Sequence, residues 1–260
     1  MPKLPLEWLK VSEHPFNHLS HSELNELQKS SGKKVLVIGG AVMDVVSTPK
    51  GTDGMSLTNQ SLPGKVSISP GGVGRNIAEA CARLGADTHL LPPLSNDPLS
   101  QAILQATEKA GVKVHALAST APCVFAAYNF PSGKFNTAVA DMEAFDVITP
   151  KAVAAHLANA KPYDMLVIDS NIPAETMLFV AEYATQHQIP LFWDPTSIHK
   201  CAKGAHPAFL KHVTYMKPNF HELQLLATKL KKPTEDVSEA LNTVFHNGAK
   251  HVVLTAGEHG

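Results

Sequence analysis

From Lys34 onward the chain alternates short apolar runs with helical patterns, and this alternation constrains the fold more than any other feature. The apolar runs are rich in β-branched residues and predict strands at 35–39, 88–91, 113–117, 164–169, 189–193, 213–217 and 251–255. Helical patterns separate most of them, at 75–84, 97–110, 150–159, 173–187, 220–230 and 235–247. Because continuous apolar strands are typical of sheets buried on both faces, the sequence predicts an α/β fold with a largely parallel sheet covered by helices.

Two stretches interrupt the alternation and predict a second, smaller β-structure. Residues 55–70 carry little helix signal, whereas residues 123–141 have the pattern of a β-hairpin that turns at Pro131, Ser132 and Gly133. A hairpin inserted into a series of strands and helices usually forms a flap beside the main sheet. We therefore expect a lid built from about 55–70 and 123–141.

Both ends of the sequence depart from the pattern. Residues 1–33 lack a clear period, apart from a short helical stretch in which Ser20 and Glu23 have capping-box spacing, and we interpret them as an N-terminal extension or linker. The last predicted strand runs into a glycine-containing tail, where a parallel strand should be followed by a helix that packs on the sheet. We therefore expect residues 34–260 to be an incomplete, C-terminally truncated domain.

Composition excludes several classes of protein. The 260 residues carry a net charge of −1, with 44% hydrophobic and 17% charged residues, which suits a large core and argues against a generally basic nucleic-acid-binding surface. The three cysteines are far apart and fit neither a disulfide framework nor a CxxC zinc site. No apolar run reaches the roughly 18 residues of a membrane span, and no signal-peptide pattern is present. We expect a cytoplasmic protein that binds a small molecule, not nucleic acid or membrane.

Glycines and polar residues gather where predicted strands end. Gly39, Gly40 and Asp44 follow the first strand, and a glycine cluster at 71–74 precedes Asn76. Ligands of open α/β sheets bind at the carboxyl ends of strands, which places Asp44 to hold hydroxyl groups, and glycines that open a helix let backbone N–H groups approach a ligand. The alternatives are a turn or cap for Asp44 and a tight turn for the glycines. The third glycine of a dinucleotide fingerprint is missing, which disfavours an oxidoreductase.

Two further motifs lie in the C-terminal half. Asn219 and Glu222 follow the strand at 213–217, with the spacing of a helix capping box and also of a pair that holds a hydrated Mg²⁺ near phosphates. Residues 255–260 form a strand end that runs into a glycine loop, which is compatible with a nucleotide contact or with an ordinary turn.

Taken in this order, the motifs resemble those of the PfkB, or ribokinase-like, carbohydrate kinase family. The resemblance covers 34–260 and includes Gly39, Gly40, Asp44, the segment 71–76, Asn219-x-x-Glu222 and Thr255-x-Gly257-x-x-Gly260. Within the family, residues 140–143 (Ala-Asp-Met-Glu) and 194–197 (Asp-Pro-Thr-Ser) are similar to pseudouridine kinase. The resemblance implies a Rossmann-like parallel sheet flanked by helices, with a small β lid.

The resemblance also implies an activity, ATP-dependent phosphorylation of a ribonucleoside or sugar hydroxyl, with pseudouridine converted to pseudouridine 5′-phosphate as the favoured reaction. The implied substrate contacts are Asp44, Gly71, Gly72, Asn76, Asp141 and Asn171. The implied nucleotide contacts are Asn219, Thr255, Gly257 and Gly260, with Asn219 and Glu222 positioning Mg²⁺ through water. Family members also suggest a monovalent cation and a homodimer formed through the lid, and the extension at 1–33 is compatible with a linker from a fused glycosidase domain.

One departure from the family concerns catalysis. The GAGD segment, whose Asp is the general base and whose glycine amides form the anion hole, does not occur in the 260 residues and is expected beyond Gly260. We therefore expect this chain alone to be a poor or inactive kinase, with no catalytic base of its own. The alternatives are a non-catalytic ribonucleoside-binding module and a kinase for ribose or adenosine. The sequence does not fix the nucleobase, the oligomeric state or the ion dependence.

Overall fold

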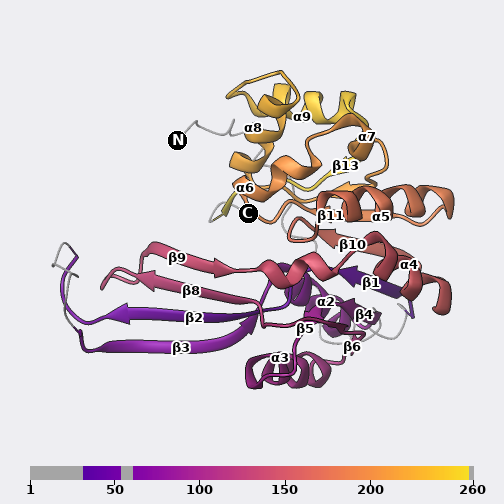
Figure 1. Cartoon of the computed structure of the whole chain (residues 1–260). Coiled ribbons are helices and arrows are strands. Elements are labelled where there is room, and N and C mark those ends of the chain that lie inside the picture. Colours follow the sequence, from indigo (N-terminus) through magenta and orange to yellow (C-terminus); the bar gives the residue numbers. More distant parts are fainter. Residues whose placement is uncertain (1–31, 54–60, 258–260) are drawn as a thin grey trace, which may run out of the picture.

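The structure, a computed structural model, describes residues 32–53 and 61–257 (Figure 1). The predicted helical stretch that contains Ser20 and Glu23, most of the extension at 1–33 and Gly260 lie outside the described residues. Within the described part, no helix is long and apolar enough to cross a membrane.

The main sheet is parallel and seven-stranded, in the order β13-β12-β11-β10-β1-β4-β6. Its strands are β1 (Lys34–Ile38), β4 (Asp87–Leu91), β6 (Lys113–Val114), β10 (Met165–Asp169), β11 (Leu191–Asp194), β12 (Tyr215–Met216) and β13 (His251–Val252). The parallel α/β fold predicted from the apolar runs is therefore confirmed. The strands at the two edges are shorter than predicted, and the run at 113–117 is divided between β6 and the start of β7 (Leu117–Ala118), which pairs with β5 (Pro93–Leu94).

Helices cover both faces of the main sheet. They are α2 (Val73–Arg83), α3 (Pro98–Lys109), α4 (Pro150–Asn159), α5 (Ala174–Gln186), α6 (Ile198–Cys201), α7 (Pro207–Leu210), α8 (Phe220–Lys229) and α9 (Val237–His246), with 3-10 turns η1 (Glu143–Val147) and η2 (Ala202–Gly204). Leu36 and Ile38 of β1 point into one core with α4, α5, α8 and α9, whereas Val35 and Val37 point into a second core with α2 and α3. The alternation of side chains along a strand thus gives each face its own hydrophobic core.

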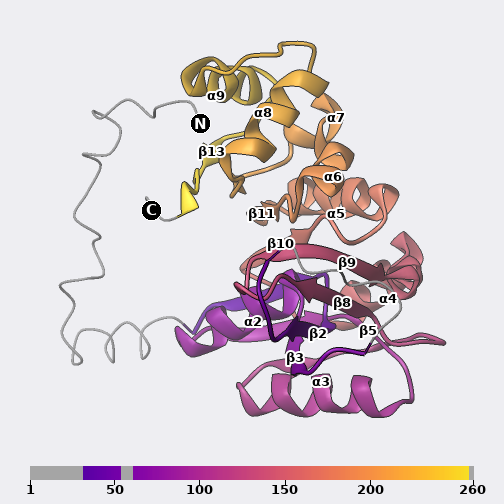
Figure 2. The same cartoon turned by 90° about the vertical axis from the view of Figure 1, so that its left-hand side faces the viewer.

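A smaller sheet of four strands, in the order β3-β2-β8-β9, extends sideways from the main body in Figure 1 and points toward the viewer in Figure 2. Its strands are β2 (Val42–Pro49), β3 (Gly64–Gly71), β8 (Val124–Asn129) and β9 (Phe135–Asp141). The last two form the hairpin predicted at 123–141. Strand β2, which lies between β3 and β8, was not predicted, because its residues 42–46 continue the apolar run of β1 after the two glycines. We call these four strands the small sheet.

Candidate functional site

The small sheet joins the main sheet at the carboxyl end of β1, where Gly39 and Gly40 lead directly into β2. Asp44 lies two residues inside β2, close to this junction, and its carboxylate packs against Gly71 at the end of β3. A Cβ atom at Gly71 would lie 2.0 Å from Asp44 Oδ2, so only glycine leaves room for the carboxylate. Burial raises the pKa of Asp44, and Arg75 partly offsets that rise. The junction therefore holds a half-buried carboxylate with the capacity to accept hydroxyl hydrogen bonds.

The glycine cluster at 71–74 packs against the same junction. Gly72 has a φ of +96°, and a Cβ atom there would lie 2.5 Å from the carbonyl oxygen of Gly40, which also accepts a hydrogen bond from Arg75 N at 2.8 Å. Asn76 N donates to Gly72 O at 2.9 Å, so the first turn of α2 directs these N–H groups to protein acceptors. The tight turn that the sequence allowed as an alternative is therefore present, and a ligand contact of Gly72 stays a prediction. The side chain of Asn76 is exposed in that turn.

Asp169, at the carboxyl end of β10, was not singled out from the sequence and organises the junction. Its carboxylate is fully buried and accepts hydrogen bonds from Gly40 N at 2.7 Å, Gly74 N at 2.8 Å and Asn171 N at 2.8 Å. A Cβ atom at Gly39 would lie 2.6 Å from Asp169 Oδ2. Burial raises the pKa of Asp169, and the three backbone donors oppose that rise. One buried carboxylate therefore ties together β1, β10 and the start of α2.

Asn171 follows Asp169 and lies over Gly40, where a Cβ atom would come within 2.7 Å of Asn171 Nδ2. Its Oδ1 accepts a hydrogen bond from Nζ of Lys200, a half-buried residue of α6 that sequence reasoning also missed. Lys203 reaches the same segment and donates to the carbonyl oxygens of Ser170 and Ile172, each at 3.0 Å. No local sequence pattern indicates either lysine, because both bond to residues 170–172, about 30 positions earlier in the chain.

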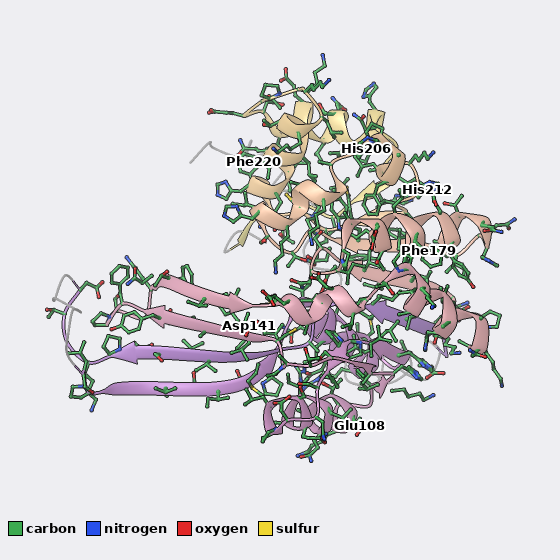
Figure 3. All side chains as sticks on the ribbon, in the orientation of Figure 1. Glu108, Asp141, Phe179, His206, His212 and Phe220 are labelled. Atoms are coloured by element: carbon green, nitrogen blue, oxygen red, sulfur yellow. The ribbon has the colours of Figure 1, made fainter. Side chains whose placement is uncertain are left out.

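Asp141 ends β9 at the foot of the small sheet, where that sheet meets the main body (Figure 3). Burial raises the pKa of the neighbouring Cys123 thiol to about 12, with Asp141 adding to the rise and Lys200 opposing it. Both charges therefore lie within electrostatic reach of Cys123. Asp141 pairs with Val124 of β8, which pairs with Met43 of β2, so Asp141 lies level with the start of β2, where Asp44 is found.

The predicted nucleotide residues form a second cluster, at the carboxyl ends of β12 and β13. Asn219 and Glu222 make the complete capping box of α8: Glu222 N donates to Asn219 Oδ1 at 2.9 Å, and Asn219 N donates to Glu222 Oε2 at 2.8 Å. Thr255 pairs with Asn219 through an isolated bridge, and Thr255 N donates to Pro218 O at 3.0 Å. Gly257 follows with a φ of +61°. Gly260 lies outside the described residues.

Whether this second cluster fits Mg²⁺ depends on its acidic groups. Glu222 is buried, and its pKa is raised by burial and by the nearby carboxylate of Asp194, which pairs with Lys217 Nζ at 3.1 Å. Of the two carboxylates, only that of Asp194 forms an ion pair with Lys217. The described residues contain no group of three or more His, Cys, Asp or Glu side chains arranged to hold a metal. A Mg²⁺ contact of Asn219 and Glu222 therefore stays a prediction, for an ion that would keep its own water ligands.

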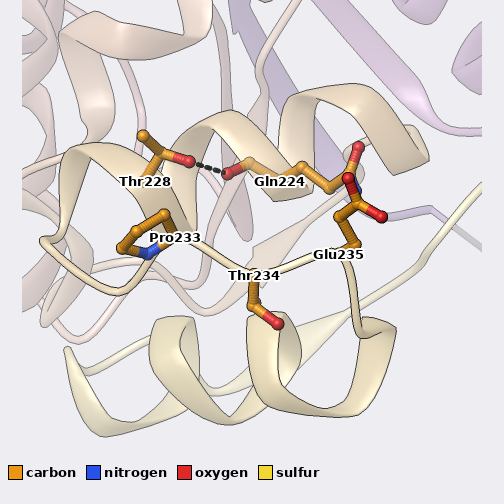
Figure 4. Close-up of a pocket in the computed structure, with 5 residues that line it drawn as sticks. All are labelled: Gln224, Thr228, Pro233, Thr234 and Glu235. Carbon is orange, nitrogen blue, oxygen red and sulfur yellow. Dashed lines mark hydrogen bonds between the residues drawn. The ribbon is translucent and has the colours of Figure 1, made fainter.

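A hollow of about 480 Å³ lies beside α8 (Figure 4). Its lining residues are Gln224, Thr228, Pro233, Thr234 and Glu235, and within it Thr228 Oγ1 donates to the backbone oxygen of Gln224 at 2.9 Å. None of these residues belongs to either cluster. The hollow is therefore not part of the candidate site.

The two sheets and their polar junction define a class of fold, the ribokinase-like α/β fold. A carbohydrate kinase from Agrobacterium tumefaciens matches this structure with a TM-score of 0.73 and 24% identity, covering 86% of this chain and 71% of that one. Ribokinase from Arabidopsis thaliana, solved with ribose and ATP, matches with a TM-score of 0.68 and 20% identity, covering 87% and 72%. The ribokinase-like fold expected from the motifs is confirmed.

The chain belongs to the pfkB family of carbohydrate kinases, which it matches over residues 32–260. It is 30% identical to pseudouridine kinase from Escherichia coli K12 over 231 residues, which cover 87% of this chain and 71% of that protein. It is 26% identical to Arabidopsis thaliana pseudouridine kinase over 246 residues, covering 86% and 63%. It is 31% identical to Bacillus subtilis ribokinase over 217 residues, covering 80% and 68%. The expected sugar or nucleoside kinase family is thus confirmed.

Proposed function

We propose that the protein phosphorylates a ribonucleoside hydroxyl with ATP as donor, and that pseudouridine is its substrate. The observation that carries this proposal is the Asp44 carboxylate held against Gly71 at the junction of the two sheets, with the Asn171 amide across Gly40. A carboxylate accepts hydrogen bonds from neighbouring hydroxyls, and an amide N–H donates to an oxygen, which together suit a ribose ring. The two pseudouridine kinases among the relatives support the choice of nucleoside.

The second cluster is the proposed nucleotide site. Asn219, Thr255 and Gly257 lie together at the carboxyl ends of β12 and β13, where open α/β sheets bind ligands. Asn219 and Glu222 would hold the water ligands of Mg²⁺, and the bound ion would neutralise charge on the phosphates of ATP. Thr255 Oγ1, which donates weakly to Pro218 O at 3.4 Å, is free to reorient toward a phosphate or ribose oxygen.

The small sheet is the proposed lid and the proposed contact of a homodimer. Large apolar side chains on β3 and β9 are mostly exposed: Val66 is 63% exposed, Ile68 61%, Phe135 62% and Val139 73%. A monomer rarely leaves such a group of side chains in water, so a second copy of the small sheet is a suitable cover. A covered lid would also exclude water from the junction during phosphoryl transfer.

Catalysis needs one group that residues 1–260 do not supply. The family's GAGD segment, which provides the base and the anion hole, does not occur in this sequence. We propose that residues 1–260 alone bind nucleoside and nucleotide without measurable turnover. Production of pseudouridine 5′-phosphate by this chain alone, measured by coupled ADP release, would contradict that part of the proposal.

A second candidate substrate is ribose, because the B. subtilis ribokinase is as similar to the chain as the pseudouridine kinases are. Isothermal titration calorimetry with pseudouridine, uridine, adenosine and ribose, each with and without MgATP, distinguishes these candidate substrates. Pseudouridine is expected to bind most tightly, and tighter binding of ribose would transfer the proposal to ribose. Nucleoside binding without MgATP binding would favour a non-catalytic binding module.

Variants connect the titration to the site. Asp44→Asn removes the charge that accepts the hydroxyls, and we expect it to weaken nucleoside binding about 10- to 100-fold, the range of a hydrogen bond to a charged group. Glu108→Gln is the matched control, because Glu108 is exposed on α3, away from the junction (Figure 3). Equal affinities of the Asp44→Asn variant and the wild type would remove Asp44 from the site.

A further inference from the structure

The amide of Asn171 is held between two opposite charges. Its Oδ1 accepts a hydrogen bond from Lys200 Nζ, and its side chain lies near the buried carboxylate of Asp169, whose pKa it helps to lower. An ammonium group has only donors, whereas a carboxylate has only acceptors. Lys200 can therefore meet only the oxygen of the amide, and Asp169 can meet only its nitrogen.

This pairing determines which way the amide faces. The oxygen and nitrogen of an asparagine amide have nearly the same shape, and their positions are normally set by the surrounding hydrogen bonds. A flipped Asn171 would place its NH₂ group against the ammonium of Lys200 and its oxygen over Gly40. The charges thus select a single orientation, in which Nδ2 lies over Gly40 at the junction of the two sheets.

Lys200 is not needed to hold the backbone of this segment. Lys203 Nζ already donates to the carbonyl oxygens of Ser170 and Ile172. The Ser170 side chain accepts a hydrogen bond from Trp193 Nε1 at 2.9 Å. The bond from Lys200 differs from these because it reaches a side chain, and that side chain faces the proposed substrate.

We propose that Lys200 is a positioning residue that locks the Asn171 amide with its free N–H toward the substrate, so that this part of the site takes an oxygen acceptor of the nucleoside. The identity of the ligand rests on the proposed function, whereas the orientation of the Asn171 amide by Lys200 does not. A half-buried ammonium is unfavourable by itself: burial lowers the pKa of Lys200, and Asp169 opposes that shift. A role in fixing the amide explains why the charge is placed there.

The test compares Lys200→Met, which keeps the aliphatic stem, with Lys200→Arg, which keeps a cationic donor. Lys109→Met, on the exposed end of α3, is the matched control. The first readout is the pair of Asn171 side-chain amide signals in a ¹⁵N-edited NMR spectrum of the full chain, assigned with Asn171→Ser. We expect slowly exchanging signals in the wild type, in Lys109→Met and in Lys200→Arg, and rapid exchange in Lys200→Met.

The second readout is pseudouridine affinity by calorimetry. Lys200→Met is expected to weaken binding about 3- to 10-fold, the range of one hydrogen bond. Lys200→Arg should recover most of that loss. Asn171→Asp keeps a partner for Lys200 but has no N–H, and it should weaken binding at least as much. Wild-type affinity in Asn171→Asp would overturn the proposal, and this variant also serves if Lys200→Met does not fold.

The NMR signals and the binding affinity test separately the orientation of Asn171 by Lys200 and the proposed function. If no nucleoside or sugar binds the wild type but the Asn171 signals still depend on Lys200, the positioning role stands and the proposed function fails. If Lys200→Met lowers the melting temperature while the Asn171 signals stay protected, Lys200 is merely structural and the proposal is overturned. Unchanged signals together with unchanged affinity overturn it as well.

Discussion

Replacing Asp169 by asparagine tests the centre of the junction, because this carboxylate binds backbone N–H groups of three separate segments. Oδ2 accepts hydrogen bonds from Gly40 N and Gly74 N, and Oδ1 accepts one from Asn171 N. Every group around the carboxylate is therefore a donor, and an amide cannot satisfy all of them.

The magnitude follows from the number of hydrogen bonds lost. Whichever orientation the new asparagine takes, its NH₂ group faces at least one backbone N–H. At least one hydrogen bond to a charged acceptor, contributing about 1.5–3 kcal/mol, is therefore lost, and the remaining N–H groups bond to a weaker, neutral acceptor. The substitution also removes a buried charge, which is favourable and offsets part of the loss. We expect a net loss of about 3 kcal/mol in the free energy of unfolding. For a domain of this size, that loss lowers the melting temperature by about 6–12 °C.

Urea denaturation at neutral pH, followed by circular dichroism, measures the change directly. The matched control is Asp164→Asn, because Asp164 is an exposed aspartate that also accepts from a backbone amide, Lys34 N at 2.7 Å, and from Lys33 Nζ. Only a small change is expected there, since exposed ion pairs contribute little. If Asp169→Asn is as stable as Asp164→Asn, the buried carboxylate does not hold the junction together and the reasoning is refuted.

Three shorter predictions concern other parts of the molecule. Gly71→Ala places a methyl group where the Asp44 carboxylate lies, so nucleoside affinity should fall about tenfold by calorimetry, and an unchanged affinity would argue against Asp44 as a contact. Burial lowers the pKa of His156 from 6.5 to about 4, so the unfolded chain binds this proton more readily and the wild type loses stability as the pH falls through that window. In urea titrations, the free energy of unfolding of His156→Gln should depend less on pH between 6.5 and about 4. An unchanged pH dependence would contradict this prediction. Val139→Lys should turn the proposed dimer into a monomer by light scattering, and a persistent dimer would exclude this face as the interface.

Local signals account for the part of the fold that the sequence predicts well. Helix α4 begins and ends at the predicted residues, and Thr149 caps it through a hydrogen bond from Ala152 N. The capping box of Asn219 and Glu222 is equally local, because its partners are three residues apart. Such features depend on neighbours in the sequence, so pattern and spacing suffice to find them.

Features that depend on distant partners were missed or misjudged. In the sequence, the residues of β2 look like a continuation of β1. Only pairing with β3 and β8, which the sequence pattern does not show, assigns them to a different sheet. Strands β12 and β13 are shorter than their apolar runs, because they lie at or beside an edge, where few partners extend the pairing. Asp169 and Lys200 have no local motif. Their roles arise from contacts with segments about 30 to 130 residues away.

The position of Asp169 explains how one site can be shared by two sheets. The chain leaves the main sheet for the small sheet through Gly39 and Gly40, and it returns from β3 to α2 through the glycine cluster at 71–74. Asp169 binds an N–H group in each of these connections, so both are anchored to the same buried carboxylate. Asp44 lies against Gly71, in one connection, and Asn171 lies over Gly40, in the other. A ligand that contacts both residues would therefore favour one position of the small sheet relative to the main sheet. The glycines at 39–40 and 71–74 form the two connections through which that position is determined.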